Sequence, residues 1–357
     1  MSIKYPRFLF LLVCLSVTAQ GTKEAIQQLL PPTDNCVTEC RDLPGGMTNN
    51  LILCTTAADH HYVFRYPKKP FNETRFTKIL SLAQKAAFLQ VSPDIYNWNI
   101  DQQQMLMHYI ENARWPAYQV NEQPYHATMC LLKKFHDHMR LDVVSDEQQS
   151  YTPFNWIVTG GKKLLDNPHI PDHLGLAIAR VQLLAEKVAP WLELNATICH
   201  GDFHKGNVLL AHSGEGLRPW IIDFDSMGVG DPYFDVVKFS RNLQPHQREE
   251  LFQCYVGESL LTPEEKEHFD IVDKIFLMVV AVIRFKAALE TLELTPQSDV
   301  LADALSKKDM EELLNSSDSL PSQSTIPASN PDVKMKQLGA VYALHEFLKK
   351  TEIYSIQ

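Results

Sequence analysis

Residues 198–239 read ICHGDFHKGNVLLAHSGEGLRPWIIDFDSMGVGDPYFDVVKF and alternate apolar runs with clusters of polar and charged side chains. Two of the apolar runs, Val208–Leu210 and Trp220–Ile222, have the composition of short β-strands. Between them lies Ser213–Gly216, a Ser-Gly-Glu-Gly sequence that is typical of a turn. These residues predict a β-hairpin with polar loops at both of its outer ends.

Oxygen-bearing side chains flank this predicted hairpin. Asn207 comes just before the first strand and Asp223 just after the second, so pairing of the strands would bring the two together. Asp202 lies five residues before Asn207, on the loop that enters the hairpin. We therefore expect these three side chains to converge, with the carboxylate of Asp225 close behind them.

Such a cluster has the composition of a phosphoryl-transfer site. Carboxylate and amide oxygens are hard ligands suited to Mg²⁺, which takes its other ligands from water and from substrate phosphates. In phosphoryl transfer a separate Asp orients the attacking hydroxyl and accepts its proton. Asp202 fits this base, and Asn207 and Asp223 fit the metal. Isolated Asp and Asn residues are more often turn or capping residues, but their combination around one hairpin favours the chemical role.

The same residues resemble the catalytic region of the aminoglycoside phosphotransferase and choline kinase superfamily. His200–Asn207 (HGDFHKGN) is similar to its catalytic loop, Ile222–Asp225 (IDFD) to its metal-binding segment, and Gly230–Asp235 (GDPYFD) to the motif that follows. Upstream, Leu43–Asn50 (LPGGMTNN) resembles the nucleotide loop of bacterial choline and thiamine kinases. Tyr62–Arg65 resembles the strand whose basic residue contacts the ATP phosphates, with arginine in place of the usual lysine.

The resemblance implies an α+β, bilobal, protein-kinase-like fold. A small β-rich N-lobe that binds the nucleotide would occupy residues 21–110, and a larger, mostly helical C-lobe with the catalytic loop and substrate site would occupy residues 111–314. Apolar spacing agrees with this order. It predicts strands at residues 51–54, 62–66 and 105–110, helices at residues 76–89, 127–139 and 174–188, and a mostly helical stretch over residues 262–314.

The resemblance also implies ATP and Mg²⁺ as cofactors and gives roles to individual residues. Asp202 would be the catalytic base, Asn207 and Asp223 the metal ligands, and Asp225 a support for the second metal or the base. His200 would orient the catalytic loop. The residues expected to hold the nucleotide are Gly45, Gly46, Thr48, Asn49, Arg65, Glu73, Tyr109 and Ile110.

Several members of that set have distinct expected functions. Arg65 would contact the phosphates, and Glu73 is the candidate for the helix-borne acid that pairs with it. Tyr109 and Ile110 would form the hinge against the adenine base. Asp235 is expected to anchor the catalytic loop rather than to react.

The acceptor implied by the resemblance is a small-molecule alcohol, with a cationic one favoured. A quaternary ammonium group would need aromatic walls and nearby carboxylates, for which the candidates are Glu111, Trp115, Trp156 and Tyr233. Aromatic residues serve more often in packing, and the sequence leaves choline, ethanolamine, thiamine and an amino sugar open as acceptors.

Composition agrees with a globular enzyme. The chain has 357 residues, of which 45% are hydrophobic and 21% charged, and this balance excludes a disordered chain and a polytopic membrane protein. It carries 33 Lys and Arg against 43 Asp and Glu, a formal net charge of −10. Because an acidic surface repels phosphate backbones, we expect no nucleic-acid partner.

The two ends of the chain differ from its body. Residues 1–20 combine basic residues, an apolar run too short to span a bilayer and a small-residue pattern, and they predict a signal peptide. This favours export, whereas a requirement for ATP favours the cytosol, so localisation stays open. Residues 315–332 are rich in Ser and Pro and predict a flexible segment. Residues 333–357 would contain a helix that docks back onto the body.

Cysteine spacing matches no zinc site. Cys36 and Cys40, four residues apart, could pair or share a helical face. Cys54, Cys130 and Cys199 lie in apolar runs and are expected to be buried thiols.

Two alternative functions remain open on the sequence. The signal-like N-terminus is compatible with an exported kinase-fold effector that acts on a protein or a lipid headgroup. A non-catalytic nucleotide-binding pseudokinase would show a damaged catalytic set, but Asp202, Asn207 and Asp223 are all present.

Overall fold

The computed structural model describes residues 21–34, 36–44, 48–115, 122–140, 153–214, 216–257, 261–294, 304–315 and 333–351. The predicted signal peptide at residues 1–20, Gly45, Gly46 and residues 316–332 lie outside these ranges. The chain divides into two compact units, one of Met1–Phe135 with Lys205–Asp225 and the other of His136–His204 with Ser226–Gln357.

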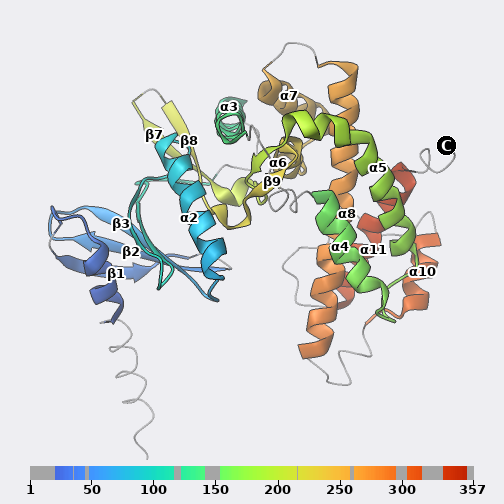
Figure 1. Ribbon diagram of the computed structural model, residues 1–357, viewed down its shortest axis with the longest axis horizontal. Helices are drawn as coiled ribbons and strands as arrows, with labels where there is room; N and C mark the ends of the chain where they lie inside the picture. Colours follow the sequence, from blue (N-terminus) through green and yellow to red (C-terminus); the bar gives the residue numbers. More distant parts are fainter. Residues whose placement is uncertain are drawn as a thin grey trace, which may run out of the picture. The chain divides into compact units, whose positions relative to one another are not determined.

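An antiparallel sheet forms the centre of the first unit, with the strand order β1-β2-β3-β5-β4 (Figure 1). The strands predicted from apolar runs are confirmed as β2, β3 and β5. The two edge strands, β1 and β4, were not predicted, because their side chains are mostly exposed or half-buried and leave a weak apolar pattern. The bounds are β1 Val37–Asp42, β2 Asn49–Thr56, β3 His61–Pro67, β4 Ile95–Asn99 and β5 Gln104–His108.

Helices cover both faces of this sheet. Residues 21–29 are helical, the dark-blue helix of Figure 1, and with Leu30 they pack on one face. The helix α2 (Glu73–Phe88) buries Phe76 and Ile79 in a separate cluster with Met105. Leu106, the next residue of β5, belongs to the first cluster, and neighbouring strand residues point to opposite faces. The predicted helix over residues 76–89 is thus confirmed and begins three residues earlier, where the Asn72 side chain accepts a hydrogen bond from the Arg75 N–H at 2.8 Å.

The predicted hairpin is confirmed as β7 (Val208–Ser213) and β8 (Gly216–Ile221) and belongs to the first unit. Main-chain hydrogen bonds attach it there. The Arg114 N–H donates to the Leu210 carbonyl at 2.9 Å, and the Ile221 N–H donates to the Val91 carbonyl at 2.9 Å. The division of the chain therefore differs from the expected boundary at residue 110, since the first unit continues to residue 135 and takes back residues 205–225.

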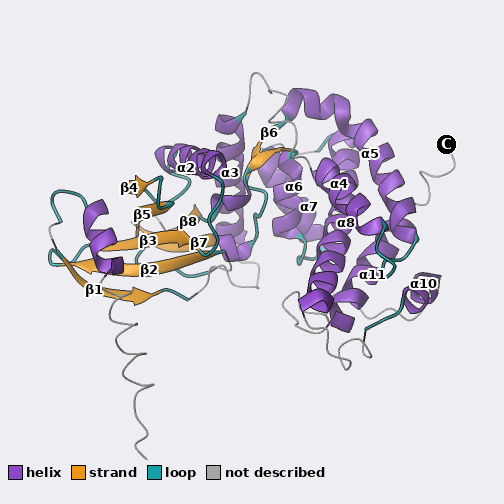
Figure 2. Ribbon diagram, turned by 60° about the horizontal axis from the view of Figure 1, so that its bottom comes forward, coloured by secondary structure: helices purple, strands orange, loops and turns teal. Residues whose placement is uncertain are grey.

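The second unit is mostly helical, as the sequence predicts, and Figure 2 shows its helices in purple around α8. Its helix α8 contacts α4, α5, α6 and α11, and it lies within the stretch over residues 262–314 that was expected to be mostly helical. Helix α3 (Glu122–Met139) leads from the first unit into the second. The others are α4 Pro153–Leu165, α5 His173–Asn195, α6 Pro232–Ser240, α7 Pro245–Val256, α8 Pro263–Leu294, α10 Lys307–Asn315 and α11 Val333–Lys350.

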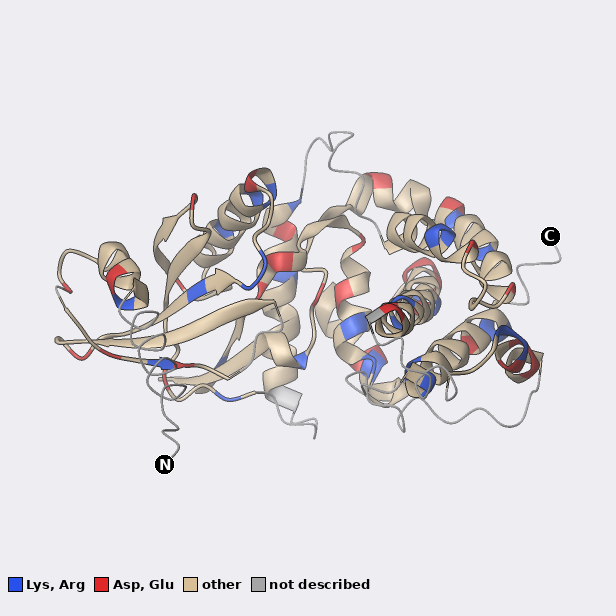
Figure 3. Ribbon diagram, turned by 90° about the horizontal axis from the view of Figure 1, so that it is seen from below, with Lys and Arg blue, Asp and Glu red and all other residues tan. Residues whose placement is uncertain are grey.

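The C-terminal helix docks as predicted. α11 packs on α8 and buries Val341, Leu344 and Phe347 completely. Among the described residues, no helix combines the length and the apolar character that a membrane crossing requires. Acidic and basic positions are interspersed along the elements of both units (Figure 3).

Candidate active site

The predicted catalytic loop begins at a two-stranded ladder in the second unit. β6 (Thr197–Cys199) pairs antiparallel with β9 (Gly228–Gly230), and residues 200–204 follow β6 as a loop. Gly201 adopts a φ of 76°, in the left-handed region that favours glycine. A side chain at Gly201 would also overlap the carbonyl oxygen of Ser226. Both constraints explain why glycine stands directly before Asp202.

Asp235, buried in α6, holds the backbone of this loop. Its carboxylate accepts hydrogen bonds from the His200 N–H at 2.6 Å and the Gly201 N–H at 2.9 Å. The Nε2 of His136 lies 3.0 Å from the same carboxylate, and its Nδ1 lies 2.8 Å from the hydroxyl oxygen of Tyr255. Burial raises the pKa of Asp235, but the bonds and charges of His136 and His200 outweigh it, so the pKa is lowered from its ordinary value. Asp235 is therefore an ionised anchor inside the protein.

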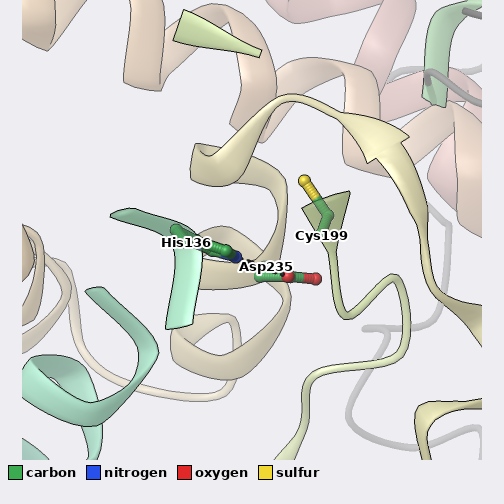
Figure 4. A group of neighbouring side chains, drawn as sticks. All are labelled: His136, Cys199 and Asp235. Atoms are coloured by element: carbon green, nitrogen blue, oxygen red, sulfur yellow. Dashed lines mark hydrogen bonds and ion pairs between the residues drawn. The ribbon is translucent and has the colours of Figure 1, made fainter. Parts of the chain in front are cut away.

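The anchor includes a group that could be mistaken for a metal site. His136, Cys199 and Asp235 are buried, and their possible ligand atoms lie within 4.8 Å of one another (Figure 4). The Asp235 oxygens already accept from the His200, Gly201 and His136 nitrogens. Burial also raises the pKa of the Cys199 thiol well above its ordinary value, and its Sγ lies 3.9 Å from the Thr197 carbonyl oxygen. The arrangement fits a structural anchor and not a metal site.

His200 orients the next residue of the loop. Its Nδ1 accepts a hydrogen bond from the Asp202 N–H at 3.2 Å, and its side chain is fully buried. The segment from His200 to Asp202 is therefore held twice, by Asp235 through the backbone N–H groups of His200 and Gly201 and by the His200 side chain through the Asp202 N–H. This is the geometry that a loop-orienting residue needs.

The Asp202 carboxylate is 37% exposed and lies between the side chains of Lys238 and His204. The Nζ of Lys238 lies 2.6 Å from Oδ1, and the Nε2 of His204 lies 3.6 Å from Oδ2. Partial burial raises the pKa of Asp202, but the His204 hydrogen bond and the Lys238 charge more than offset it and hold the pKa well below its ordinary range. Asp202 is thus a partly exposed carboxylate whose surroundings favour the ionised form, on a loop whose backbone is held by Asp235.

Lys238 is a site residue that the motifs did not reveal. It also donates to the Gly201 carbonyl at 3.2 Å, so it contacts both the backbone and the side chain of the loop. A signal for it was present in the sequence. Lys238 follows Asp235 by three residues, which places both on one face of α6.

In the first unit, two carboxylates follow the end of β8. Asp225 is buried and pairs with the Arg65 guanidinium, while its other oxygen accepts from the Asn49 amide at 2.7 Å. Asp223 adopts a φ of 66° and lies 3.5 Å from the same Arg65 guanidinium, with its side chain 33% exposed. The structure therefore gives the two acids different surroundings, one enclosed and one open.

Asn207 lies where the hairpin prediction expected it. It is buried directly before β7, and its carbonyl accepts a hydrogen bond at 3.0 Å from the N–H of Ile222, the residue before Asp223. The outer ends of the hairpin are thus side by side. The amide and carboxylate oxygens of Asn207 and Asp223 are hard donors of the kind that Mg²⁺ takes.

The expected pairing of Glu73 with Arg65 is not the one observed. Glu73 is exposed at the first residue of α2, whereas the carboxylates that pair with Arg65 are those of Asp223 and Asp225. The residue that α2 turns towards this cluster is Arg75, whose guanidinium lies 3.4 Å from the Asp225 carbonyl oxygen. The acid that pairs with Arg65, Asp225, thus lies 160 residues further along the chain and not on the neighbouring helix α2.

The other residues expected at the nucleotide are placed as follows. Thr48 accepts the Lys68 N–H at its carbonyl, and its hydroxyl lies 3.0 Å from the amide nitrogen of Asn49. Tyr109 and Ile110 follow β5, with Ile110 buried and the Tyr109 ring 6.1 Å from the ring of His61. They continue the chain from the strand that pairs with β3, which carries Arg65.

The four candidates for binding a cationic acceptor divide between the units. Glu111 and Trp115 are exposed in the first unit, and Glu111 pairs with His61 at 3.3 Å. Trp156 is half-buried in α4 of the second unit. Tyr233 corrects the expectation, because it is buried and its ring contacts the aromatic rings of Trp191, Phe252, Tyr255 and His268. Tyr233 serves in packing, where it has no open face for a ligand.

Comparison with known proteins agrees with this architecture. A model of the phosphotransferase enzyme family matches residues 39–264. No curated protein matches the chain by sequence. The fold is similar to a choline/ethanolamine kinase family protein from Mesorhizobium loti, with a TM-score of 0.59, 20% identity and coverage of 90% of this chain and 98% of that one.

Other solved structures share the fold. The choline kinase LicA from Streptococcus pneumoniae gives a TM-score of 0.57 and 20% identity, covering 75% of this chain and 90% of that one. The choline kinase from Cryptosporidium parvum gives a TM-score of 0.56 and 11% identity, covering 94% of this chain and 96% of that one. The predicted α+β kinase-like fold is thus confirmed.

Proposed function

This chain belongs to the phosphotransferase enzyme family, and on that basis we propose that it transfers the γ-phosphate of ATP to a hydroxyl of a small cationic alcohol, choline or a similar amino alcohol. The observation that carries the proposal is the catalytic loop. An ionised, partly exposed Asp202 stands on a backbone held by the buried carboxylate of Asp235. A merely structural turn would not need an exposed carboxylate fixed with such rigidity.

The low pKa of Asp202 defines what this residue does. A carboxylate whose pKa is held below its ordinary range is a weak base, so it does not deprotonate a free alcohol in the ground state. It accepts a hydrogen bond from the acceptor hydroxyl and directs the oxygen's lone pair at the phosphorus. In a largely dissociative transition state the proton leaves late, so positioning is the larger contribution.

Asn207 and Asp223 supply the oxygens that would hold Mg²⁺. The donor set fits the metal, since both are hard oxygen ligands and Asp223 has an exposed carboxylate. When bound, Mg²⁺ neutralises charge on the β- and γ-phosphates. Asp225, which is engaged by Arg65 and Asn49, supports this pair by fixing Arg65.

Arg65 is the proposed phosphate contact on the sheet. A guanidinium has five N–H donors, so its two carboxylate partners leave donors for phosphate oxygens. Asp225 holds it in a buried position on β3. Thr48, Asn49 and the glycines before them would cover the phosphates, and Tyr109 and Ile110 would contact the adenine.

The proposed acceptor class rests on net charge and on the solved structures of similar fold. A protein with a formal charge of −10 attracts cations over anions at long range. The names of the similar structures include choline and ethanolamine kinases and a macrolide 2'-phosphotransferase. Glu111, Trp115 and Trp156 are the residues we propose to test for contact with the cationic group.

Acceptor choice is tested by product formation from ATP and Mg²⁺ with choline, ethanolamine, thiamine and an aminoglycoside supplied separately. We expect a phosphate ester of an amino alcohol with the highest kcat/KM. A phosphorylated aminoglycoside as the preferred product would overturn the amino-alcohol assignment while retaining phosphoryl transfer. ATP binding with no ester from any acceptor would support the pseudokinase alternative.

The signal-like N-terminus motivates a second candidate, an exported kinase that phosphorylates a protein or a lipid headgroup. Intact-mass analysis of candidate proteins and of phospholipid vesicles after incubation with ATP distinguishes it. An added phosphate on either, together with no turnover of free amino alcohols, would favour this second candidate.

A further inference from the structure

Cys40 and Cys54 face each other across the hairpin formed by β1 and β2. The sequence suggested Cys36 as the partner of Cys40, but four residues along an extended strand span about 13 Å. Disulfides need Cα atoms less than about 7 Å apart. Of the thiols expected to be buried, Cys54 and Cys199 are buried and Cys130 is exposed.

The hydrogen-bond pattern places Cys40 and Cys54 at a non-hydrogen-bonded position of the ladder. The Leu43 N–H donates to the Leu51 carbonyl at 2.9 Å, which makes Leu43 and Leu51 a hydrogen-bonded pair. Such pairs alternate along an antiparallel ladder. Cys40 and Cys54 lie three steps further along the same register, so they form a non-hydrogen-bonded pair.

The other neighbour of β2 gives the same result. The Thr56 N–H donates to the His60 carbonyl at 3.0 Å, and two steps along, Cys54 is paired with Tyr62. The backbone groups of Cys54 therefore point to β3 and away from Cys40. Opposite residues at a non-hydrogen-bonded position have Cα atoms about 4.5 Å apart, which lies within the range of disulfides.

The two side chains also share one face and one environment. Cys54 is fully buried in the cluster that contains Ile52 and Phe64, and Cys40 packs against that cluster. Burial raises the pKa of both thiols, and each thiol interacts with the other. Because the thiolate is the reactive form, exchange at these thiols is slow in the folded protein and needs an effective oxidant.

We propose that Cys40 and Cys54 become joined by a cross-strand disulfide when the chain meets a disulfide oxidant, such as oxidised glutathione or a thiol–disulfide oxidoreductase. One cysteine thiolate attacks the oxidant and forms a mixed disulfide, releasing one reduced thiol. The second cysteine thiolate then displaces the other half of the oxidant as a thiol. The two cysteines lose two protons and two electrons, and one oxidant disulfide becomes two thiols.

The cross-link would close a loop that contains the proposed nucleotide loop. The proposed nucleotide loop, residues 43–50, comprises the connection from β1 to β2 and the first two residues of β2, and it lies between the two cysteines in the sequence. A disulfide would fix the register of the strands that carry this loop. This consequence for nucleotide binding rests on the proposed function, whereas the disulfide itself does not.

The test uses the full chain equilibrated in reduced and oxidised glutathione mixtures, quenched in acid, denatured and alkylated. Cleavage after Glu39 and Arg41 separates Cys36, Cys40 and Cys54 into different peptides. We expect a linked pair of peptides that contain Cys40 and Cys54, 2 Da lighter than the two thiols. Cys40→Ala should leave Cys54 alkylated, and the matched control Cys36→Ala should retain the link.

Absence of this link at every glutathione ratio, while the exposed Cys36 forms a mixed disulfide, would overturn the proposal. A link between Cys36 and either of the other two cysteines would overturn it as well. Circular dichroism of Cys40→Ala establishes that the variant is folded. Phosphoryl transfer is assayed separately, so an inactive protein with the link would refute only the proposed function.

Discussion

Lys238 is the closest cation to Asp202, and the charge state of Asp202 depends on it and on His204. With Nζ 2.6 Å from the carboxylate, its positive charge favours the ionised form. Partial burial acts in the opposite direction and raises the pKa of Asp202. Lys238 therefore works through Asp202 as a positioning residue, and its effect should appear in the pH dependence of the reaction.

Replacing Lys238 by Met should raise the pKa of Asp202. The effect of burial, which raises this pKa, would then be offset by His204 alone. Activity requires the ionised carboxylate and is present above its pKa, so the acidic limb of the kcat profile should move to higher pH. Lys238→Arg retains the charge and should restore most of the acidic limb. Measured kcat between pH 4 and 9 decides the matter, because the wild-type limb lies below this window. A methionine variant whose kcat stays as flat as the wild type down to pH 4 would refute the role.

Asp235 acts on stability rather than on proton transfer. Replacing it by Ala leaves the buried N–H groups of His200 and Gly201 without acceptors, at about 1–3 kcal/mol for each unsatisfied group. Its lowered folded-state pKa means that its contribution is present above the unfolded value and is lost as pH falls through the folded value. Urea unfolding of Asp235→Ala should show a loss of about 2–6 kcal/mol of unfolding free energy.

The matched control is Asp202→Ala, which removes a 37% exposed carboxylate that pairs with the partly exposed Lys238 and His204. It should lose activity and little stability. If Asp235→Ala unfolded at the wild-type urea concentration, the anchoring role would be wrong.

At the scale of elements, the sequence predicted strands and helices best where apolar residues are concentrated. The hairpin, the central strands and α11 have apolar runs or stripes that burial in the structure explains. The edge strands β1 and β4 lack such a signal because solvent covers much of their surface. An edge strand forms by hydrogen bonding to its neighbouring strand, and a single sequence does not reveal which strand that is.

The sequence also does not predict pairs between side chains that are far apart along the chain. Motif spacing placed Asp202, Asn207 and Asp223 on the correct loops but could not show that Asp225 binds Arg65. The sequence predicts Glu73, on the adjacent helix, as the acidic partner of Arg65. The pair of Arg65 and Asp225 depends on the register of β3 in its sheet and on where the chain leaves β8. Both are set by tertiary structure.

The docking of α11 on α8 gives a prediction for a whole element. Phe347 is fully buried in this contact, so Phe347→Ala should cost about 3–5 kcal/mol of unfolding free energy. Lys350→Ala, at the exposed end of the same helix, should stay within about 0.5 kcal/mol of the wild type. Equal urea midpoints for the two variants would show that α11 is not part of the cooperative unit.

At the scale of the whole molecule, two compact units carry the two halves of the proposed chemistry. The first unit holds Arg65, Asn207, Asp223 and Asp225, and the second holds Asp202 with its anchor. The chain passes from one to the other within the catalytic loop, between His204 and Lys205. The short chain between Asp202 and Asn207 therefore connects the proposed base to the proposed metal ligands.

Transfer of a labelled γ-phosphate from ATP to choline or ethanolamine tests this account most directly. Wild-type protein should form the labelled ester, and Asp202→Asn should lower its rate by about 10²–10⁴-fold. Asp166→Asn, at an exposed position outside the site, should retain wild-type activity. Label transfer by Asp202→Asn at the wild-type rate would contradict the account.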